Sequence, residues 1–184
     1  MTTEPATLPT ERLLLRQWHD DDLHAWARMN ADPEVREFFP DVLEQHEAAG
    51  SLASFRADLE ERGWGWWAVE ERATGTLIGM AGLDPIEQGM PVSGVEAGWR
   101  LARGSWGKGY ATEAARAVFG YGFGQISLPE ILAMAAAGNV RSQAVMRRLG
   151  MTHDPADDFD DPTVAPGPLR RTVLYRLRNP HLAA

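Results

Sequence analysis

The 184-residue sequence predicts one mixed α/β domain, with a mostly antiparallel sheet flanked by helices. Short apolar or alternating segments, which are typical of strands, fall between longer segments with helical periodicity. The length suits a single domain with a sizeable core, and neither internal repeats nor a domain linker interrupts the chain. We therefore expect the domain to span residues 9–179, between loose tails at 1–8 and 180–184.

The domain is expected to begin with a strand and a helix. Residues 12–16 form a short apolar run flanked by arginines, which suits a first strand. The three consecutive aspartates at 20–22 then supply a cap and favourable first-turn charges for a helix over 23–30.

Two further helices are expected before the main strands. The Asp-Pro pair at 32–33 predicts a short helix that continues through Phe38 and stops at Pro40. A longer helix is expected over 45–62, because apolar residues recur on one face and Gly63 follows as a helix end.

Strand patterns dominate the middle of the chain. Residues 64–70 and 76–83 are predicted to form two strands joined by a turn at 72–75. Residues 92–101 place apolar side chains at alternate positions and give a third strand.

The last third of the chain alternates helices and strands. Helices are expected over 111–123 and 139–149, with the fully apolar segment 131–137 between them as a buried strand. Residues 154–168 are rich in Asp and Pro and should form a loop, after which the alternation over 171–178 predicts the last strand.

Composition excludes several function classes. The absence of cysteine removes disulfides, thiolate metal sites and cysteine nucleophiles, and the five histidines show no metal-ligand spacing, so no metal is expected. The net charge of −8 argues against a protein that coats nucleic acid and is compatible with a cationic partner. Without a signal-like start or an apolar run near the ~20 residues of a membrane span, the sequence indicates a cytoplasmic protein with no membrane association.

The segment 106–115, WGKGYATEAA, places two glycines between a strand and a helix. A dinucleotide-binding fingerprint needs a third glycine where Thr112 stands, and a Walker-type loop needs Ser or Thr after Lys108, where Gly109 stands. What remains is a turn whose successive N–H groups point into one concavity and attract an anion the size of a diphosphate. The alternative is a tight connection in which glycine merely permits the bend.

A second pattern follows the predicted buried strand. Asn139 and Ser142 are three residues apart, so both side chains lie on one face of the helix that begins there. Asn139 is also a favourable amino-terminal cap, and the alternative is that it only caps the helix while Ser142 is a surface hydroxyl.

With these two motifs the chain resembles the GNAT superfamily of acetyl-CoA-dependent N-acetyltransferases. It is most similar to the Rim-type subgroup, whose founding members acetylate the amino termini of ribosomal proteins. The family's pyrophosphate loop resembles residues 104–109, and residues 110–114 fit the subgroup closely. Residues 139–142 with 149–151 resemble its next motif. Weaker similarity covers 32–35, 67–69, 77–79 and 96–99.

The resemblance implies acetyl-CoA as co-substrate, with its pantetheine arm between two splayed strands at 92–101 and 131–137. The residues that it assigns to the cofactor are Trp99, Arg100, Leu101, Gly104, Trp106, Gly107, Lys108, Gly109, Tyr110, Ala111, Thr112, Asn139 and Ser142. Two positions depart from the family pattern. Gly104 replaces the usual Gln or Arg, so phosphate contacts there would come from the backbone or from Arg103. Met146 stands where many relatives have a tyrosine acid.

Glu96 is the expected general base, because it lies on the strand that should carry the acetyl group. A carboxylate among Trp99, Trp66 and Phe38 would have its pKa raised toward neutrality, which suits removal of a proton from an amine. The alternative is that strand alternation turns Glu96 toward solvent.

The remaining site residues follow from the same resemblance. Asp84, at a strand end, is the fallback base, and the hydroxyl of Ser142 is the expected acid for the departing thiolate, which water alone can also assist. Phe38, Trp66 and Asp84 are expected to line the acceptor pocket.

The function expected from this resemblance is transfer of an acetyl group from acetyl-CoA to a primary amine. A peptide or protein amino terminus is the preferred acceptor. One alternative is a small-molecule amine such as an antibiotic, a polyamine or an amino acid. Another is a non-catalytic acetyl-CoA-binding module. The subgroup is compatible with a homodimer, which the residues themselves do not indicate.

Overall fold

The structure is a computed structural model that describes residues 5–182. The strands are β1 (Leu8–Pro9), β2 (Leu13–Arg16), β3 (Trp66–Glu71), β4 (Thr76–Pro85), β5 (Val95–Leu101), β6 (Glu130–Ala136), β7 (Thr152–His153), β8 (Phe159–Asp160) and β9 (Arg171–Arg178). The helices are α1 (Asp22–Asn30), α2 (Gln45–Arg62), α3 (Tyr110–Gly124) and α4 (Val140–Arg148), with 3₁₀ turns at Arg103–Ser105 and Pro155–Asp157.

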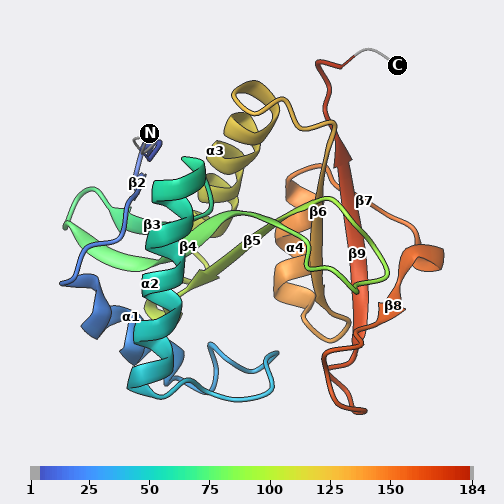
Figure 1. The fold of residues 1–184 in the computed structure, drawn as a ribbon, viewed down its shortest axis with the longest axis horizontal. Helices are drawn as coiled ribbons and strands as arrows, with labels where there is room; N and C mark the ends of the chain where they lie inside the picture. The colour runs from blue at the N-terminus through green and yellow to red at the C-terminus, as the bar shows by residue number, and fades with distance from the viewer. Residues whose placement is uncertain (1–4, 183–184) are drawn as a thin grey trace.

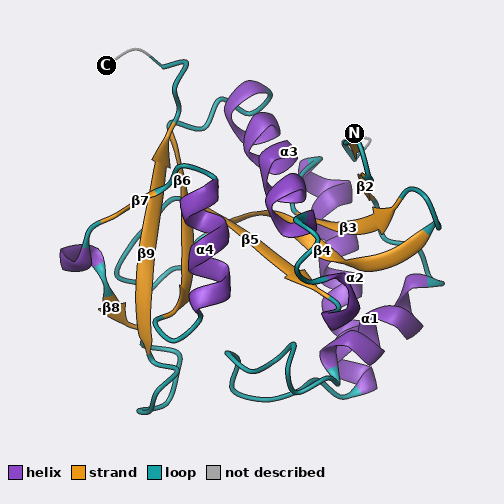
Figure 2. Ribbon diagram, turned by 180° about the vertical axis from the view of Figure 1, so that it is seen from behind, coloured by secondary structure: helices purple, strands orange, loops and turns teal. Residues whose placement is uncertain are grey.

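The strands form one sheet in the order β1-β2-β3-β4-β5-β6-β9-β7, and β8 adds to β9. Every pair in the described part is antiparallel except β5 with β6. Helices α1 and α2 cover one face (Figure 1), and α3 and α4 cover the other (Figure 2). The predicted α/β fold with a mostly antiparallel sheet is confirmed. Between residues 5 and 182, every helix is too short or too polar to cross a lipid bilayer.

Tryptophans fill the core on both faces of the sheet. Trp18 and Trp26 meet edge to face with ring centroids 5.0 Å apart, and Phe55 of α2 lies 5.8 Å from each of them. Trp67 is fully buried on the opposite face and contacts Tyr121 of α3 at 5.4 Å. Because such rings bury about 150–250 Å² each, they fix the helices firmly to the sheet.

Strands β5 and β6 separate almost as soon as they meet. Their parallel pairing has a single register position, Glu96 opposite Leu132, and Figure 1 shows the two strands diverging from there. On its other edge β5 pairs with β4 through its even-numbered residues, as the bond from Ala102 N–H to the carbonyl of Ile78 (2.8 Å) shows. The backbone groups of the odd-numbered residues after Glu96 therefore face the gap between β5 and β6.

The structure confirms the elements that have strong local signals. Helix α2 spans the predicted 45–62, and Gly63 ends it in the left-handed conformation with φ of 79°. The last strand spans the predicted 171–178, and α3 and α4 differ from prediction by about one residue at each end.

The short helix predicted over 33–38 is wrong, because this segment is a series of turns. The carboxylate of Asp32 accepts the N–H of Glu34 at 2.9 Å, and the N–H of Arg36 bonds to the carbonyl of Asp32 at 3.1 Å. The first is a helix-cap bond and the second closes a single helical turn, so a turn of helix starts at Asp32 but does not continue. Pro40 also disfavours a helical conformation at the residue before it.

The prediction that an aspartate side chain caps the first helix is wrong. Asp21 occupies the cap position of α1 but makes no side-chain hydrogen bond to the helix. Asp22 instead accepts two bonds from Arg16 at 2.7 and 2.9 Å and one from the N–H of His19 at 2.7 Å. These bonds to Arg16 and His19 hold the pKa of this mostly buried aspartate below its ordinary value, against the effect of burial.

Several predicted boundaries also shift. The strand predicted from residue 92 begins at Val95, the one predicted from residue 64 begins at Trp66, and the predicted loop over 154–168 contains a 3₁₀ turn and β8. Within the predicted amino-terminal tail, the carbonyl of Ala6 accepts a bond from Trp67 Nε1 at 2.7 Å, so the fold begins earlier. The remainder of the predicted tails, at 1–4 and 183–184, lies outside the described residues.

Candidate active site

The turn between β5 and α3 presents a row of free backbone N–H groups. Gly107 and Gly109 have φ of +75° and +81°, values that favour glycine, and Gly109 is the residue before the first turn of α3. Within the described chain, the N–H groups of residues 107–112 have no hydrogen-bond acceptor. Such groups at a helix amino terminus form an anion site, so the geometry supports the phosphate-binding interpretation of this turn.

The turn is held in place from the amino-terminal hairpin. Arg12 donates from Nη1 to the carbonyl of Lys108 at 2.9 Å and from Nε to the carboxylate of Glu113 at 2.7 Å. Glu113 also accepts a bond from the hydroxyl of Thr10 at 2.6 Å, and the hydroxyl of Tyr110 bonds to Glu71. The sequence analysis missed these contacts, because their partners lie far apart along the chain. They preorganise the turn for binding.

A groove of about 780 Å³ adjoins the start of α3. Its lining residues are Thr10, Glu11, Arg12, Gly109, Thr112, Glu113, Arg116, Ala117 and Arg148. Of its three arginines, Arg12 is paired with Glu113, whereas no ion pair is found for Arg116 or Arg148 within residues 5–182. The groove therefore extends the anion-binding surface beyond the turn.

Arg103 and Trp106, which precede the two glycines and were expected near the cofactor phosphates, bind other parts of the protein. Arg103, the expected substitute for the missing family side chain at Gly104, forms ion pairs with Asp32 (3.4 Å) and Glu34. Trp106 donates from Nε1 to the carbonyl of Leu101 at 2.8 Å. Both side chains are therefore engaged elsewhere, and only backbone groups remain to contact a ligand at this end of the turn.

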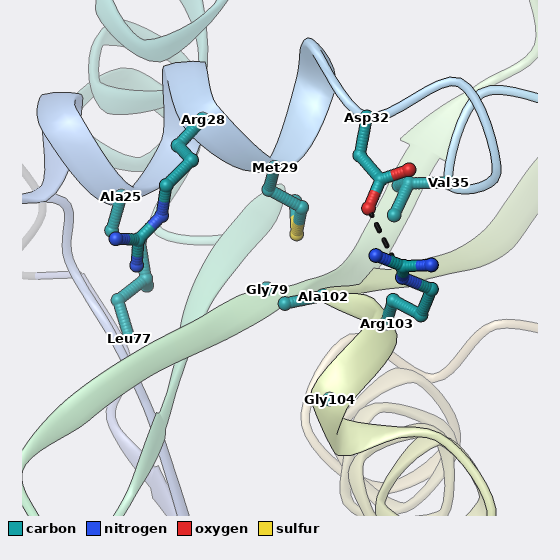
Figure 3. A pocket seen from close by; sticks show the side chains of 10 residues that line it. All are labelled: Ala25, Arg28, Met29, Asp32, Val35, Leu77, Gly79, Ala102, Arg103 and Gly104. Atoms are coloured by element: carbon teal, nitrogen blue, oxygen red, sulfur yellow. Dashed lines mark ion pairs between the residues drawn. The ribbon is translucent and has the colours of Figure 1, made fainter.

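A smaller cavity of about 250 Å³ lies between the end of α1, the start of β4 and the turn (Figure 3). The pair of Asp32 with Arg103 borders it, together with Met29, Val35 and Gly79. Gly79 pairs with Leu101, so this cavity lies at the opposite end of β5 from Glu96. None of the predicted catalytic residues lines it.

Glu96 lies where β5 and β6 meet, directly opposite Asp84 of β4. Its carboxylate has no hydrogen-bond donor within residues 5–182. Burial, and to a smaller extent the negative charges of Asp84, Glu87 and Asp161, together raise the pKa of Glu96 to about 7. Asp84 is held by Arg62 at 3.0 Å, yet burial still raises its pKa. The site thus contains a carboxylate that can exchange a proton near neutral pH.

The expected surroundings of Glu96 are partly wrong. Side chains alternate along β5, so Trp99 lies on the opposite face from Glu96. Trp66 does share the face of Glu96, and its ring lies over Gly98, where a Cβ would be only 3.0 Å from it. Phe38 lies 3.4 Å from the position of a Cβ on Gly138, next to α4 rather than next to Asp84. The high pKa therefore comes from burial and neighbouring acids, without the expected aromatic cage.

The backbone pairing separates the three predicted contacts of the pantetheine arm. Trp99 and Leu101 direct their backbone groups toward the gap between β5 and β6, although the carbonyl of Leu101 is already bonded to Trp106. The backbone of Arg100 instead belongs to the ladder with β4. Of the three, Trp99 offers both an N–H and a carbonyl to the gap.

Asn139 caps α4, as the sequence indicates. Its Oδ1 accepts the N–H of Ser142 at 3.0 Å, so the capping interpretation is confirmed, and its amide nitrogen makes no hydrogen bond to a described residue. The hydroxyl of Ser142 is partly exposed and is likewise free of partners in the described chain. Met146, one turn later, is buried. No hydrogen bond joins Ser142 to Glu96 across the part of the chain that the structure describes.

Replacing Asn139 with aspartate separates its two roles. An aspartate keeps the oxygen that caps α4, so the melting temperature should stay within a few degrees of that of the natural protein. It loses the free amide donor and adds a negative charge, so the dissociation constant for acetyl-CoA should rise about tenfold. Calorimetry measures the affinity, and an unchanged value would restrict Asn139 to capping.

Another arginine, Arg141, links the two sides of the gap. Its guanidinium lies 4.4 Å from the centroid of the Trp106 ring and pairs with Glu37 of the turn segment after α1. Sequence reasoning had no signal for this contact, since it depends on where α4 begins relative to the glycine turn. Among the described residues, no three His, Asp or Glu side chains come together as a metal site.

Comparisons with known proteins identify the family of this chain. The family model described as acetyltransferase (GNAT) domain matches residues 12–152. Over 145 residues the chain is 31% identical to the N-acetyltransferase YoaA of Bacillus subtilis, covering 78% of this chain and 81% of YoaA. A solved acetyltransferase from Agrobacterium tumefaciens is 28% identical, with a TM-score of 0.77 over 97% of both chains. The coenzyme A complex of RimL, a ribosomal L7/L12 alpha-N-protein acetyltransferase, shares the fold at 15% identity, with a TM-score of 0.74 over 94% of this chain and 98% of RimL.

Proposed function

The chain belongs to the GNAT acetyltransferase family, and from this premise we propose that it acetylates the amino terminus of a peptide or protein with acetyl-CoA. The acetyltransferase activity follows from the family, whereas the acceptor and the roles of individual residues are our proposal. The single observation that carries the cofactor assignment is the row of six free N–H groups at residues 107–112, next to the gap between β5 and β6.

These residues fit a coenzyme A molecule. The N–H groups of the turn would bind the diphosphate, and the groove with Arg116 and Arg148 offers positive charge to the nucleotide end. The backbone of Trp99 would pair with the pantetheine arm, and the free amide nitrogen of Asn139 would donate to it. Acetyl-CoA supplies the thioester-bound acetyl group.

Glu96 is proposed to take the proton of the attacking amine. Its pKa near 7 keeps a large fraction ionised at neutral pH while making the carboxylate basic enough to accept that proton. The neighbouring carboxylates of Asp84 and Asp161 would attract a protonated amine to the site. Ser142 is proposed to donate a proton to the leaving sulfur. No covalent enzyme nucleophile is needed for this reaction.

A small-molecule amine remains the second candidate acceptor. RimL is an acetyltransferase of a ribosomal protein, and the shared fold supports a protein amino terminus without deciding the acceptor. A non-catalytic acetyl-CoA-binding module is disfavoured, because such a module has no need for a buried glutamate whose pKa is near 7.

The test is thiol release from acetyl-CoA across a panel of peptides, polyamines, amino acids and aminoglycosides. We expect turnover with peptides whose amino terminus is free and none with the same peptides acetylated beforehand. Faster turnover with a polyamine or an aminoglycoside than with every peptide would favour the small-molecule function. Tight acetyl-CoA binding with no turnover on any amine would favour the non-catalytic module.

A further inference from the structure

One arginine on β5 lies against α1 with no carboxylate to neutralise it. Arg100 donates from Nη1 to the side-chain oxygen of Asn30 at 2.8 Å, and Asn30 is fully buried. The Nε of Arg100 is buried and has no partner, and within residues 5–182 no carboxylate forms an ion pair with this guanidinium. Burial without a counter-charge lowers the pKa of Arg100 to about 9, so it stays a cation at neutral pH.

A second cation lies close by. Arg36 makes the environment of Arg100 more positive, and both guanidiniums lie 4.3 Å from the centroid of the Phe39 ring. The Nε of Arg36 donates to the backbone carbonyl of Asp41 at 2.8 Å, and Arg36 has no ion pair in the described chain. Two like charges on one aromatic ring repel each other, so an anion bound to both would relieve that repulsion.

A ligand can reach this pair of cations. The Nη2 of Arg100 has no partner among the described residues, and unlike Nε it is not fully buried. Phe39 is one of the few large apolar side chains that are exposed.

The charges along one face of β5 form a gradient. Glu96 and Arg100 point to the same face, with Gly98 and the Trp66 ring that lies over it between them. Their Cα atoms are about 13 Å apart at 3.3 Å per residue. Glu96 stands beside Asp84 and further carboxylates, whereas Arg100 stands beside Arg36. A molecule with an amine at one end and an anion at the other matches this arrangement.

We propose that the acceptor carries a carboxylate, which Arg100 and Arg36 bind while the amine faces Glu96. The acceptor class is a peptide whose carboxylate lies two to four residues from the amino terminus, as a free carboxyl end or an acidic side chain. An extended chain spans at most about 3.3–3.6 Å per residue, and the arginine side chain shortens the distance to be bridged. This inference rests on the proposed acetyl transfer.

The experiment compares alanine peptides of one to five residues as free acids and as carboxyl-terminal amides, with acetyl-CoA as donor. At two to four residues, kcat/KM for the free acid should exceed that for the amide at least tenfold. Arg100→Gln should bring this ratio close to one and leave the KM for acetyl-CoA unchanged. Arg100→Lys should keep part of the preference. Arg178→Gln is the matched control, since Arg178 is exposed at the end of β9 and should leave the ratio as it is.

Three outcomes would overturn the inference. The first is equal kcat/KM for acid and amide at every length, and the second is an acid preference that survives Arg100→Gln. The third is a parallel loss of acetyl-CoA affinity in Arg100→Gln, which would assign the guanidinium to a coenzyme A phosphate. If no peptide is acetylated, calorimetry with the same peptides and coenzyme A tests the carboxylate site independently of acetyl transfer. Binding of the free acid that Arg100→Gln weakens supports the site. Equal binding of acid and amide contradicts it.

Discussion

Replacing Gly109 with valine is expected to raise the dissociation constant for acetyl-CoA about 100-fold. A β-branched residue is strained at the φ of +81° that Gly109 adopts, so the backbone must turn and carry the N–H groups of residues 107–112 out of line. Losing two charge-assisted hydrogen bonds to a diphosphate costs about 3 kcal/mol, which corresponds to that factor. Isothermal calorimetry with coenzyme A measures it.

Gly75→Val is the matched control for this substitution. Gly75 has φ of +66° in the exposed turn after β3, and a side chain there would meet no neighbour within 4 Å. The control should suffer a similar backbone strain and a similar loss of stability, while its affinity for coenzyme A stays that of the natural protein. Equal loss of affinity in both variants would mean that general destabilisation, and not the turn, explains the result.

Glu96→Gln is expected to lower kcat about 100-fold or more at pH 8, because glutamine cannot accept the proton of the amine. In the natural protein the rate should rise with pH through about 7, the pKa at which Glu96 loses its proton. Because a peptide amino terminus itself ionises at about pH 8, the natural protein and the variant are compared on the same peptide. The part of the rise centred near pH 7 should be absent from the variant, and an unchanged profile would remove Glu96 as the base.

Glu87→Gln tests the cause of the raised pKa. Removing one of the negative charges near Glu96 should lower its pKa, so the rise of the rate should move to lower pH while kcat on the plateau stays similar. A profile that stays in place would show that the charge of Glu87 does not influence the pKa of Glu96. The two glutamine variants thus separate the group that titrates from a group that only influences its titration.

The same substitution of Glu96 should stabilise the protein at high pH. Because the folded-state pKa lies above the ordinary value of 4.5, the folded protein binds this proton more tightly than the unfolded chain does. Ionised Glu96 therefore destabilises the fold by at most about 3 kcal/mol above pH 7, and the effect disappears below about pH 4.5. Denaturant unfolding at pH 8 and pH 4 should show Glu96→Gln gaining stability only at pH 8. Such a gain, together with lost activity, is the mark of a residue kept for function.

The local features of the site were predictable from sequence. Gly107 and Gly109 marked the turn with free N–H groups before α3, Asn139 marked the start of α4, and Gly63 marked the end of α2. Each of these signals depends on the conformation of one residue or on bonds between residues three or four positions apart. Such interactions are complete within a short segment, so sequence alone describes them.

The helix predicted over 33–38 marks where local reasoning fails. Proline at the first position and the Asp32 cap bond both favour a helix there, but Arg103 and Arg141 pair with carboxylates of the same segment. Arg103 follows β5, roughly seventy residues after this segment. Arg141 lies in the first turn of α4, roughly a hundred residues after it. Whether a short segment becomes a helix or a series of turns then depends on the elements around it.

The fold class, most of the helices and strands, and the glycine turn before α3 could be predicted from the sequence. A raised pKa for Glu96 was also predicted, but its cause was not: Asp84 lies opposite Glu96, and the described residues do not form the expected aromatic cage. The half-buried Arg100, without a counter-charge among residues 5–182, had no signal in the sequence. Burial and electrostatic fields sum over groups that lie far apart in the sequence, so they exist only once the strands and helices have packed. The periodicity of a segment carries no information about that sum.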